Sequence, residues 1–331
     1  MFRYIATTVT NGFLLNMKKI FFLMMFFVLI GAACTPKDRE PAGQASRTVL
    51  VSRVAYSDES PWKTVRQIDV EQPLRTAAFL NLDFGFTGGP SEEGKAHVTR
   101  NGGQSWLMAQ SSADCLFGLD IVGESIIWQC SLGPVGVSAD GGRTWRSVSS
   151  YGNYCRQVSF LDETTGWIAS NVEIGMTRDG GGTWNQVSLP DLADDIAAIW
   201  LRTAQDGYVL DISGILYITS DGGEHWTRRR LELGLEDQTL PSAETATAAV
   251  RFFDANRGLI VLQRLDHGRS RVEALHTNDG GESWVLENVM ETPMLISLYL
   301  SHDGSILTVT DTFDSQIYVI EHSASQKGKN G

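Results

Sequence analysis

From Thr48 onward, apolar residues either alternate with polar residues or stand in short runs between clusters of turn-forming residues. Alternation with a period of two indicates β-strands that bury one face. No long stretch repeats its apolar residues with the helical period of 3.6, so the pattern does not predict a long amphipathic helix. We therefore expect one all-β domain over residues 48–322, which is long enough to bury a substantial core.

An eight-residue pattern that ends in tryptophan occurs five times in this domain; in residues 177–184 it is Thr-Arg-Asp-Gly-Gly-Gly-Thr-Trp. The Asp can accept hydrogen bonds from turn N–H groups, the glycines permit positive φ, and the Trp supplies a large apolar surface. The acidic or amide residue and the tryptophan of each copy are Asn101 and Trp106, Asp140 and Trp145, Asp179 and Trp184, Asp221 and Trp226, and Asp279 and Trp284. The tryptophans are 39, 39, 42 and 58 residues apart, and a period near 40 in a chain of strands indicates the blades of a β-propeller.

The pattern resembles the Asp-box, or bacterial neuraminidase repeat, in its S/T-x-D-x-G-x-S/T-W form. The repeats also carry an apolar strand, a turn and a glycine followed by an aromatic or apolar residue, as in Phe160–Trp167. This combination is similar to the photosystem II stability and assembly factor family, and the similarity covers roughly residues 74 to 286. The resemblance implies a propeller that binds polypeptides. Its motifs are structural, so they support the architecture more than a particular role.

The two ends of the domain suggest how the propeller closes. A blade has four antiparallel strands, with the Asp-box between the third and the fourth. After Trp284 the sequence supplies only three more strands, at Leu295–Leu300, Ser305–Thr310 and Ile317–Glu321. The N-terminal segment Trp62–Val70 can provide the missing outer strand, which gives six blades. The resembled family usually has seven, and Thr48–Ala55 is a further strand that could change the count, so seven blades is the alternative.

The N-terminus has the pattern of an export signal. Met17-Lys18-Lys19 precedes an apolar run, and Gly31-Ala32-Ala33 then leads to Cys34. This resembles a bacterial lipobox, although Gly31 stands where Leu is usual. We expect a signal peptide over residues 1–33, with Met17 as an alternative start, a lipidated Cys34, a flexible tether over 34–47 and a disordered tail over 323–331. The protein would then be a membrane-anchored lipoprotein outside the cytoplasm; the alternatives are secretion or an uncleaved anchor.

Charge and composition narrow the class of ligand. Without residues 1–33 the chain has 24 basic and 39 acidic residues, a formal charge of −15. Nucleic acid is therefore not expected as a partner, because binding to phosphates needs a basic surface. No Cys-x-x-Cys or histidine cluster predicts a metal site, and no motif predicts a cofactor.

The Asp-box carboxylates are predicted to be structural rather than catalytic, because Asn101 replaces one of them and an amide cannot act as a general acid or base. A sialidase would need an arginine cluster, an acid and an activated tyrosine, and its Phe/Tyr-Arg-Ile-Pro motif is absent, since residues 74–77 read Leu-Arg-Thr-Ala. We expect a non-catalytic binding protein that assists assembly of a complex in the cell envelope. The alternative is a carbohydrate-active enzyme, such as a sialidase-like or other glycoside hydrolase, on the same scaffold.

Three arginines are candidates for binding the partner. Arg75 and Arg156 each lie four residues before the Phe of an inner strand, and Arg251 directly precedes Phe252. Inner strands line the axis of a propeller, so these side chains could converge on one mouth of the central channel; the family resemblance implies an arginine-rich binding face. Isolated surface salt bridges are the alternative. The sequence leaves the oligomeric state open.

Cys115 lies on the predicted inner strand of the second blade, and Cys130 lies on the next strand. With a turn near Gly123-Glu124, antiparallel pairing places these two residues close to each other, within the range for a disulfide. We expect the pair Cys115–Cys130, with Cys155 as a buried free thiol or as the rival partner of Cys115.

Overall fold

The computed structural model describes residues 50–89, 96–109, 116–131, 135–148, 151, 155–232, 247–266, 269–292 and 296–323. The chain divides into two compact units, Met1–Ser46 and Arg47–Gly331, and all the described residues belong to the second. Cys34, Cys115 and the tail from residue 324 lie outside the described residues, so the predicted signal peptide, tether and lipidation stay predictions. The described part of the chain has no helix that is long and apolar enough to cross a membrane.

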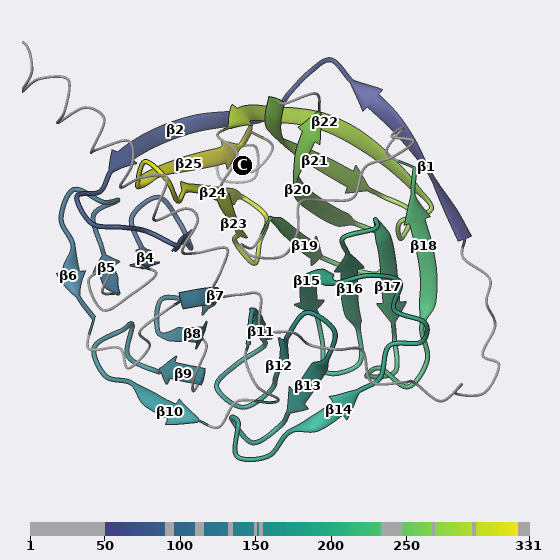
Figure 1. Ribbon diagram of the computed structural model, residues 1–331, viewed down its shortest axis with the longest axis horizontal. Coiled ribbons are helices and arrows are strands. Elements are labelled where there is room, and N and C mark those ends of the chain that lie inside the picture. The colour runs from purple at the N-terminus through teal and green to yellow at the C-terminus, as the bar shows by residue number, and fades with distance from the viewer. Residues whose placement is uncertain are drawn as a thin grey trace, which may run out of the picture. The chain divides into compact units, whose positions relative to one another are not determined.

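The described residues form an all-β fold of four-stranded antiparallel units, which we call blades (Figure 1). Blade 1 contains β3 (Thr76–Phe79), β4 (Gly85–Gly88), β5 (His97–Thr99) and β6 (Leu107–Met108). Blade 2 contains β7 (Leu116–Val122), β8 (Ile126–Ser131), β9 (Val135–Ser138) and β10 (Arg146–Val148). Blade 3 contains β11 (Gln157–Phe160), β12 (Gly166–Ala169), β13 (Ile174–Thr177) and β14 (Asn185–Val187).

The remaining blades have the same strand order. Blade 4 contains β15 (Ile196–Leu201), β16 (Gly207–Asp211), β17 (Ile215–Thr219) and β18 (Thr227–Leu231). Blade 5 contains β19 (Ala248–Phe252), β20 (Gly258–Asp266), β21 (Arg269–Thr277) and β22 (Ser283–Thr292). Blade 6 contains β23 (Ile296–Leu300), β24 (Ile306–Asp311), β25 (Gln316–His322) and β2 (Trp62–Asp69).

The first strands of these six units surround a common axis (Figure 1). Each inner strand packs against the inner strand of the next unit, in the cycle β3, β7, β11, β15, β19, β23 and back to β3. This is the arrangement of a β-propeller. The interior of the ring is closed by side chains rather than open, because most residues of the inner strands are buried.

The N-terminal strand β2 completes blade 6, as the sequence predicts for Trp62–Val70. It pairs antiparallel with β25, with Trp62 opposite His322 and Asp69 opposite Gln316. The Trp62 indole N–H also donates a hydrogen bond to Glu287 of blade 5 (3.3 Å). The first and last segments of the domain therefore share one sheet, which holds the ends of the ring together.

The strand before it, β1 (Leu50–Ser57), has a different role from the blade strands. It pairs in parallel with β18 at residues 50–52 and then with β22 at residues 53–57, so it bridges the outer edges of blades 4 and 5. The buried Ser52 hydroxyl donates to the carbonyl of Gly281 (2.6 Å). The described residues of the segment Thr48–Ala55, which could have belonged to a seventh blade, are therefore part of a strand that crosses the outer edges of blades 4 and 5.

In blades 1, 3 and 5 the second strand begins with a glycine that lies beneath an aromatic ring of the inner strand. Phe160 pairs with Gly166 across the first two strands of blade 3. A Cβ atom on Gly166 would lie 2.1 Å from the Phe160 ring. Only glycine leaves room for the ring, which then stacks on Trp128 of blade 2 with centroids 3.6 Å apart. The same glycine thus serves the packing of one blade on the next.

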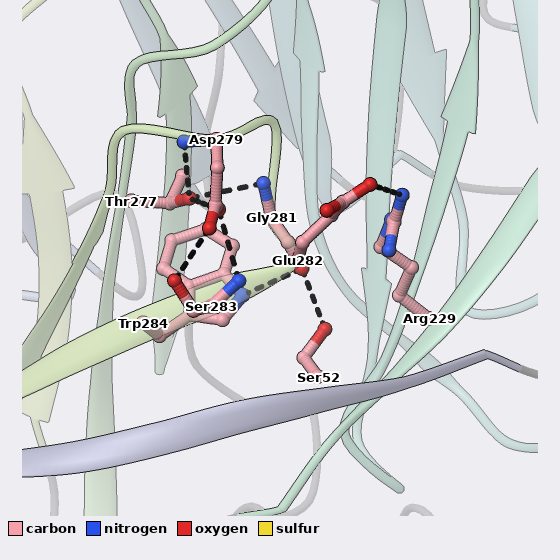
Figure 2. A network of polar contacts seen from close by, with 8 residues as sticks. All are labelled: Ser52, Arg229, Thr277, Asp279, Gly281, Glu282, Ser283 and Trp284. Carbon is pink, nitrogen blue, oxygen red and sulfur yellow. Dashed lines mark hydrogen bonds and ion pairs between the residues drawn. The ribbon is translucent and has the colours of Figure 1, made fainter.

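The Asp-boxes are hairpin turns between the third and fourth strands, and the fifth box shows their geometry (Figure 2). The Thr277 hydroxyl donates to Asp279 Oδ1 (2.8 Å) and accepts from the N–H of Gly281 (3.0 Å). Asp279 also accepts from the N–H and the hydroxyl of Ser283 at 2.9 and 2.5 Å. Gly281 has a φ of 85°, which a side chain would oppose. The Trp284 indole N–H closes the turn on the Gly281 carbonyl (3.2 Å).

The first box explains why an amide is tolerated. Asn101 Oδ1 accepts from the Thr99 hydroxyl and the Ser105 N–H, both at 3.0 Å, as the carboxylate does elsewhere. Its Nδ2 then donates to the Ser105 hydroxyl (2.8 Å), whereas in the other boxes a hydroxyl or imidazole stands beside the second carboxylate oxygen. The direction of one hydrogen bond is reversed and the turn is kept, which supports the structural role predicted for this residue.

Arginines connect the boxes of neighbouring blades. Arg100 of blade 1 donates to the Gly141 carbonyl in the box of blade 2 (3.1 Å). Arg146 of blade 2 donates to the Gly180 carbonyl in the box of blade 3 (3.2 Å). Arg229 of blade 4 lies 3.5 Å from Glu282 in the box of blade 5 (Figure 2). The outer turns are thus fixed to one another as well as to their own blades.

The disulfide differs from the sequence prediction, because Cys130 is bonded to Cys155 and not to Cys115. The residue directly opposite Cys130 on β7 is Gly118, because the register runs without interruption from Val122 opposite Ile126 at the turn. Without a side chain at Gly118 the next blade can approach: a Cβ there would lie 2.5 Å from the Arg156 carbonyl oxygen. The two Cα atoms of the disulfide are 5.5 Å apart, so Cys155 is not a free thiol and the bond joins blade 2 to blade 3.

Candidate functional site

A small cavity of about 30 Å³ lies on the axis. Residues of all six inner strands line it, and most are small or aliphatic, such as Ala198, Ala249 and Leu298. Its polar lining residues are Thr76, Gln157, Arg251 and Tyr299; among the described residues that line it there is no Asp or Glu. The cavity is therefore built mostly from small and aliphatic residues, but polar groups form much of the surface that a ligand would contact.

Phe117 of β7 is the aromatic side chain that connects this cavity to two of the candidate arginines. It is the extra residue of the bulge, because Leu116 pairs with Ser131 and Gly118 pairs with Cys130. A bulge changes the direction of a side chain relative to the regular strand. Phe117 is half-buried and lines the cavity.

Arg75 and Arg156 flank Phe117. The guanidinium carbon of Arg75 lies 3.9 Å from the ring centre, and that of Arg156 lies 5.7 Å from it. Both distances are within the range for a cation–π interaction. The structure therefore brings together two of the three predicted arginines, from blades 1 and 3, around an aromatic residue of blade 2. We call Arg75, Phe117 and Arg156 the arginine mouth.

Arg251 is not part of the arginine mouth, which corrects the expectation that the three arginines converge. The inner strands can be aligned on the residue that pairs with the following glycine, namely Phe79, Phe160 and Phe252. Arg75 and Arg156 lie four residues before this position, but Arg251 lies only one before it. Three residues of strand correspond to about 10 Å along the axis, so Arg251 lies nearer the other end of the ring. The position of Arg251 directly before Phe252 therefore does not make it equivalent to Arg75 and Arg156.

Arg251 is instead buried among aromatic rings, with 7% of its surface exposed. Its guanidinium carbon lies 4.2 Å from the ring centre of Trp200 and 5.9 Å from that of Tyr299. Its NH groups donate to the carbonyls of Val250 (2.9 Å) and Leu300 (2.6 Å). Burial lowers the pKa of Arg251, and the charge of Asp120 opposes this shift.

A polar cluster closes the ring at that end. The buried Asp120 carboxylate contacts His302 Nε2 (2.6 Å) and accepts from the Phe160 N–H (2.7 Å). The Tyr299 hydroxyl accepts from the Ile121 N–H (3.3 Å), and burial raises the pKa of this phenol. These contacts join blade 6 to blade 2 past the short strand β3, whose Ala78 leaves room for them. The cluster thus braces blades 2, 3 and 6.

One group of described residues has the spacing of a metal site, namely Asp221, Glu224 and His225 in the fourth Asp-box. His225 stands in the Ser/Thr position of that box, and its Nδ1 lies 2.7 Å from Asp221 Oδ2. Asp221 also accepts from the N–H groups of Glu224 and His225. The contacts are those of the other box turns, so the turn itself accounts for the arrangement.

The family model described as "Photosynthesis system II assembly factor YCF48" matches residues 142–250, about a third of the chain. No curated protein matches. The WD40 β-propeller domain of Doa1 is 10% identical, with a TM-score of 0.50 over 80% of this chain and 98% of that one. A structure titled "YCF48 bound to D1 peptide" is 13% identical, with a TM-score of 0.49 over 83% and 99% of the chains. An ancestral GH74 enzyme is 12% identical, with a TM-score of 0.46 over 73% and 35%.

At these identities the likeness to solved structures concerns the fold alone. The protein is a β-propeller. Its Asp-boxes and the family match make it a propeller of the bacterial neuraminidase repeat type that resembles the photosystem II assembly factor family, as the sequence predicted.

Proposed function

We propose that this protein is a non-catalytic factor that binds a segment of another polypeptide and assists the assembly of a complex in the cell envelope. The observation that carries this proposal is the arginine mouth, in which Arg75 and Arg156 flank Phe117 from two different blades. The description of the matching family model as an assembly factor supports the same role.

The chemistry of the mouth favours an acidic or C-terminal segment of the partner. A guanidinium group matches the two oxygens of a carboxylate and can make paired hydrogen bonds with them. A half-buried aromatic ring between two such groups offers apolar surface to a neighbouring side chain. Because the mature chain has an overall negative charge, this local positive site would also select where an acidic segment binds.

The proposal includes attachment to the membrane through a lipid on Cys34, as the sequence pattern predicts. Cys34→Ser should then release the protein from the membrane fraction in mild salt without changing its melting temperature, because the tether separates the anchor from the propeller. The wild-type protein, treated identically, is the control. Quantitative partition of the Ser variant into detergent would contradict the lipid anchor and leave the binding proposal untouched.

The binding proposal can be tested by placing a photo-crosslinking amino acid at Phe117 in cells that express the full chain. We expect a discrete crosslinked product that contains an envelope protein. The matched control is the same amino acid at Leu107, which is exposed on the outer strand of blade 1. Equal products from both positions, or none from Phe117, would contradict the proposal. A crosslink from Phe117 to a glycan only would favour the carbohydrate-active alternative.

A further inference from the structure

Arg251 carries a charge that the described residues balance only in part. A buried guanidinium keeps its proton, because its intrinsic pKa is above 12. The two hydrogen bonds of Arg251 go to the neutral carbonyls of Val250 and Leu300. Among the described residues no carboxylate lies within ion-pair distance of it. A buried charge without a contacting opposite charge is costly unless another group compensates it.

Asp120 is the acidic residue that acts on Arg251 through its charge, but its oxygens are already occupied. Oδ1 contacts His302 and Oδ2 accepts from the Phe160 N–H. In addition, the Nε–H of Arg251 is buried and has no hydrogen-bond partner within the described part of the chain. Arg251 therefore has both an incompletely balanced charge and an unused donor.

Arg251 is one of the residues that line the axial cavity. Thr76 of blade 1 also lines the cavity and offers a second donor. Its Oγ1 accepts from the buried Ser297 hydroxyl (3.0 Å), so the hydrogen of the Thr76 hydroxyl can point to a ligand. Tyr299 and the aliphatic residues of the lining would exclude water from the remainder of the site.

We propose that the axial cavity binds one small monovalent anion, held by Arg251 and Thr76. A cavity of about 30 Å³ has room for about two water molecules, so it fits an ion of the size of chloride. The anion would contact the buried guanidinium group directly and stabilise the packing of blades 1, 5 and 6. This inference does not rest on the proposed function.

The test is the melting temperature of the intact protein as chloride replaces gluconate at constant ionic strength. We expect saturable stabilisation, with a rise of about 3–6 °C once chloride exceeds its dissociation constant tenfold. Formate is tested in the same way. If formate stabilised the protein and chloride did not, the proposal that the site binds a halide ion would be wrong. No difference between chloride and gluconate would overturn the proposal.

Arg251→Met should abolish the chloride dependence and should fold, because an apolar side chain of similar volume often replaces a buried charge without loss of stability. The matched control is Arg257→Met, which removes an exposed arginine of the same blade and should keep the full dependence. If Arg251→Met does not fold, Thr76→Val serves as the second variant, and it should weaken chloride binding at least threefold.

Anomalous scattering from crystals grown in bromide provides a direct measurement. We expect one peak in the axial cavity of the wild-type protein. Density for water alone at that position, or chloride dependence that persists in Arg251→Met, would show that the anion is not bound there.

Discussion

The guanidinium carbon of Arg75 lies 3.9 Å from the centre of the Phe117 ring, although the two residues belong to different blades. The contact exists because a bulge in β7 adds one residue before Gly118. The same glycine lets the Arg156 backbone and the Cys130–Cys155 disulfide approach β7 from the other side. One irregularity thus places two positive charges around one aromatic ring, and this is the arrangement to which we assign the proposed partner binding.

The tryptophans of the Asp-boxes should contribute unequally to stability. Trp284 is buried (2% exposed), because β1 pairs with β22 at this residue, whereas Trp184 is only half-buried. Trp284→Ala should therefore cost about 3–5 kcal/mol of unfolding free energy, and Trp184→Ala should cost clearly less. Urea unfolding of the two variants measures this difference. If the two variants lost the same unfolding free energy, this would contradict the conclusion that β1 covers Trp284.

The box carboxylates should make stability depend on pH in the acid range. Hydrogen bonds from the N–H and hydroxyl of Thr183 lower the pKa of Asp179 from 3.8 to about 2. A lowered pKa gives stability that is present above about pH 4 and is lost as the pH falls towards 2. Asp179→Asn should be tolerated, since its amide can donate to Thr183 as Asn101 does to Ser105.

The unfolding midpoint in urea, measured for the wild-type protein and Asp179→Asn from pH 7 to pH 2, checks this prediction. The wild-type protein should be the more stable at neutral pH, and the difference should shrink between pH 4 and pH 2 because only the carboxylate is titrated. A difference that stays constant over the whole range would show that the charge of Asp179 is not involved.

The disulfide should stabilise the junction of blades 2 and 3. It closes a loop between residues that are 25 apart in sequence, for which the loss of unfolded-state entropy corresponds to about 3 kcal/mol. Reduction should lower the urea midpoint of the wild-type protein and leave that of Cys130→Ser/Cys155→Ser unchanged. Peptide mapping without reductant should recover the Cys130–Cys155 crosslink, also in Cys115→Ser. Recovery of a crosslink to Cys115 would contradict the structure.

The regular parts of the fold could be predicted because they repeat. Each Asp-box contains the residues that its turn needs, so the five hairpins and the strands beside them follow from residues such as Asp279 and Gly281. The pairing of β2 with β25 could be predicted as well, because three strands after Trp284 left one outer strand missing. The first inference depends on the chemistry of the turn residues, and the second depends on the number of strands that a blade requires.

The candidate site could be predicted only in part, because it depends on single-residue offsets. The bulge that moves Phe117 adds one residue to β7. Gly118 is a residue type that often marks a bulge, but it does not show which neighbouring residue is the extra one. Gly118 rather than Cys115 lies opposite Cys130, because the register that starts at the turn with Val122 opposite Ile126 reaches Cys130 at Gly118. A small offset also separates Arg251 from Arg75 and Arg156, because three residues along a strand are a small distance in sequence but about 10 Å in space.

The central claim is that the arginine mouth binds an acidic segment of an envelope protein. Its most direct measurement is the amount of partner that co-purifies with the tagged full-length protein from detergent-solubilised membranes. Arg75→Gln/Arg156→Gln should reduce this amount at least tenfold at unchanged melting temperature, whereas Arg230→Gln, at an exposed arginine of β18, should leave it unchanged. Equal recovery of the partner with the double variant and with the wild-type protein would contradict the account.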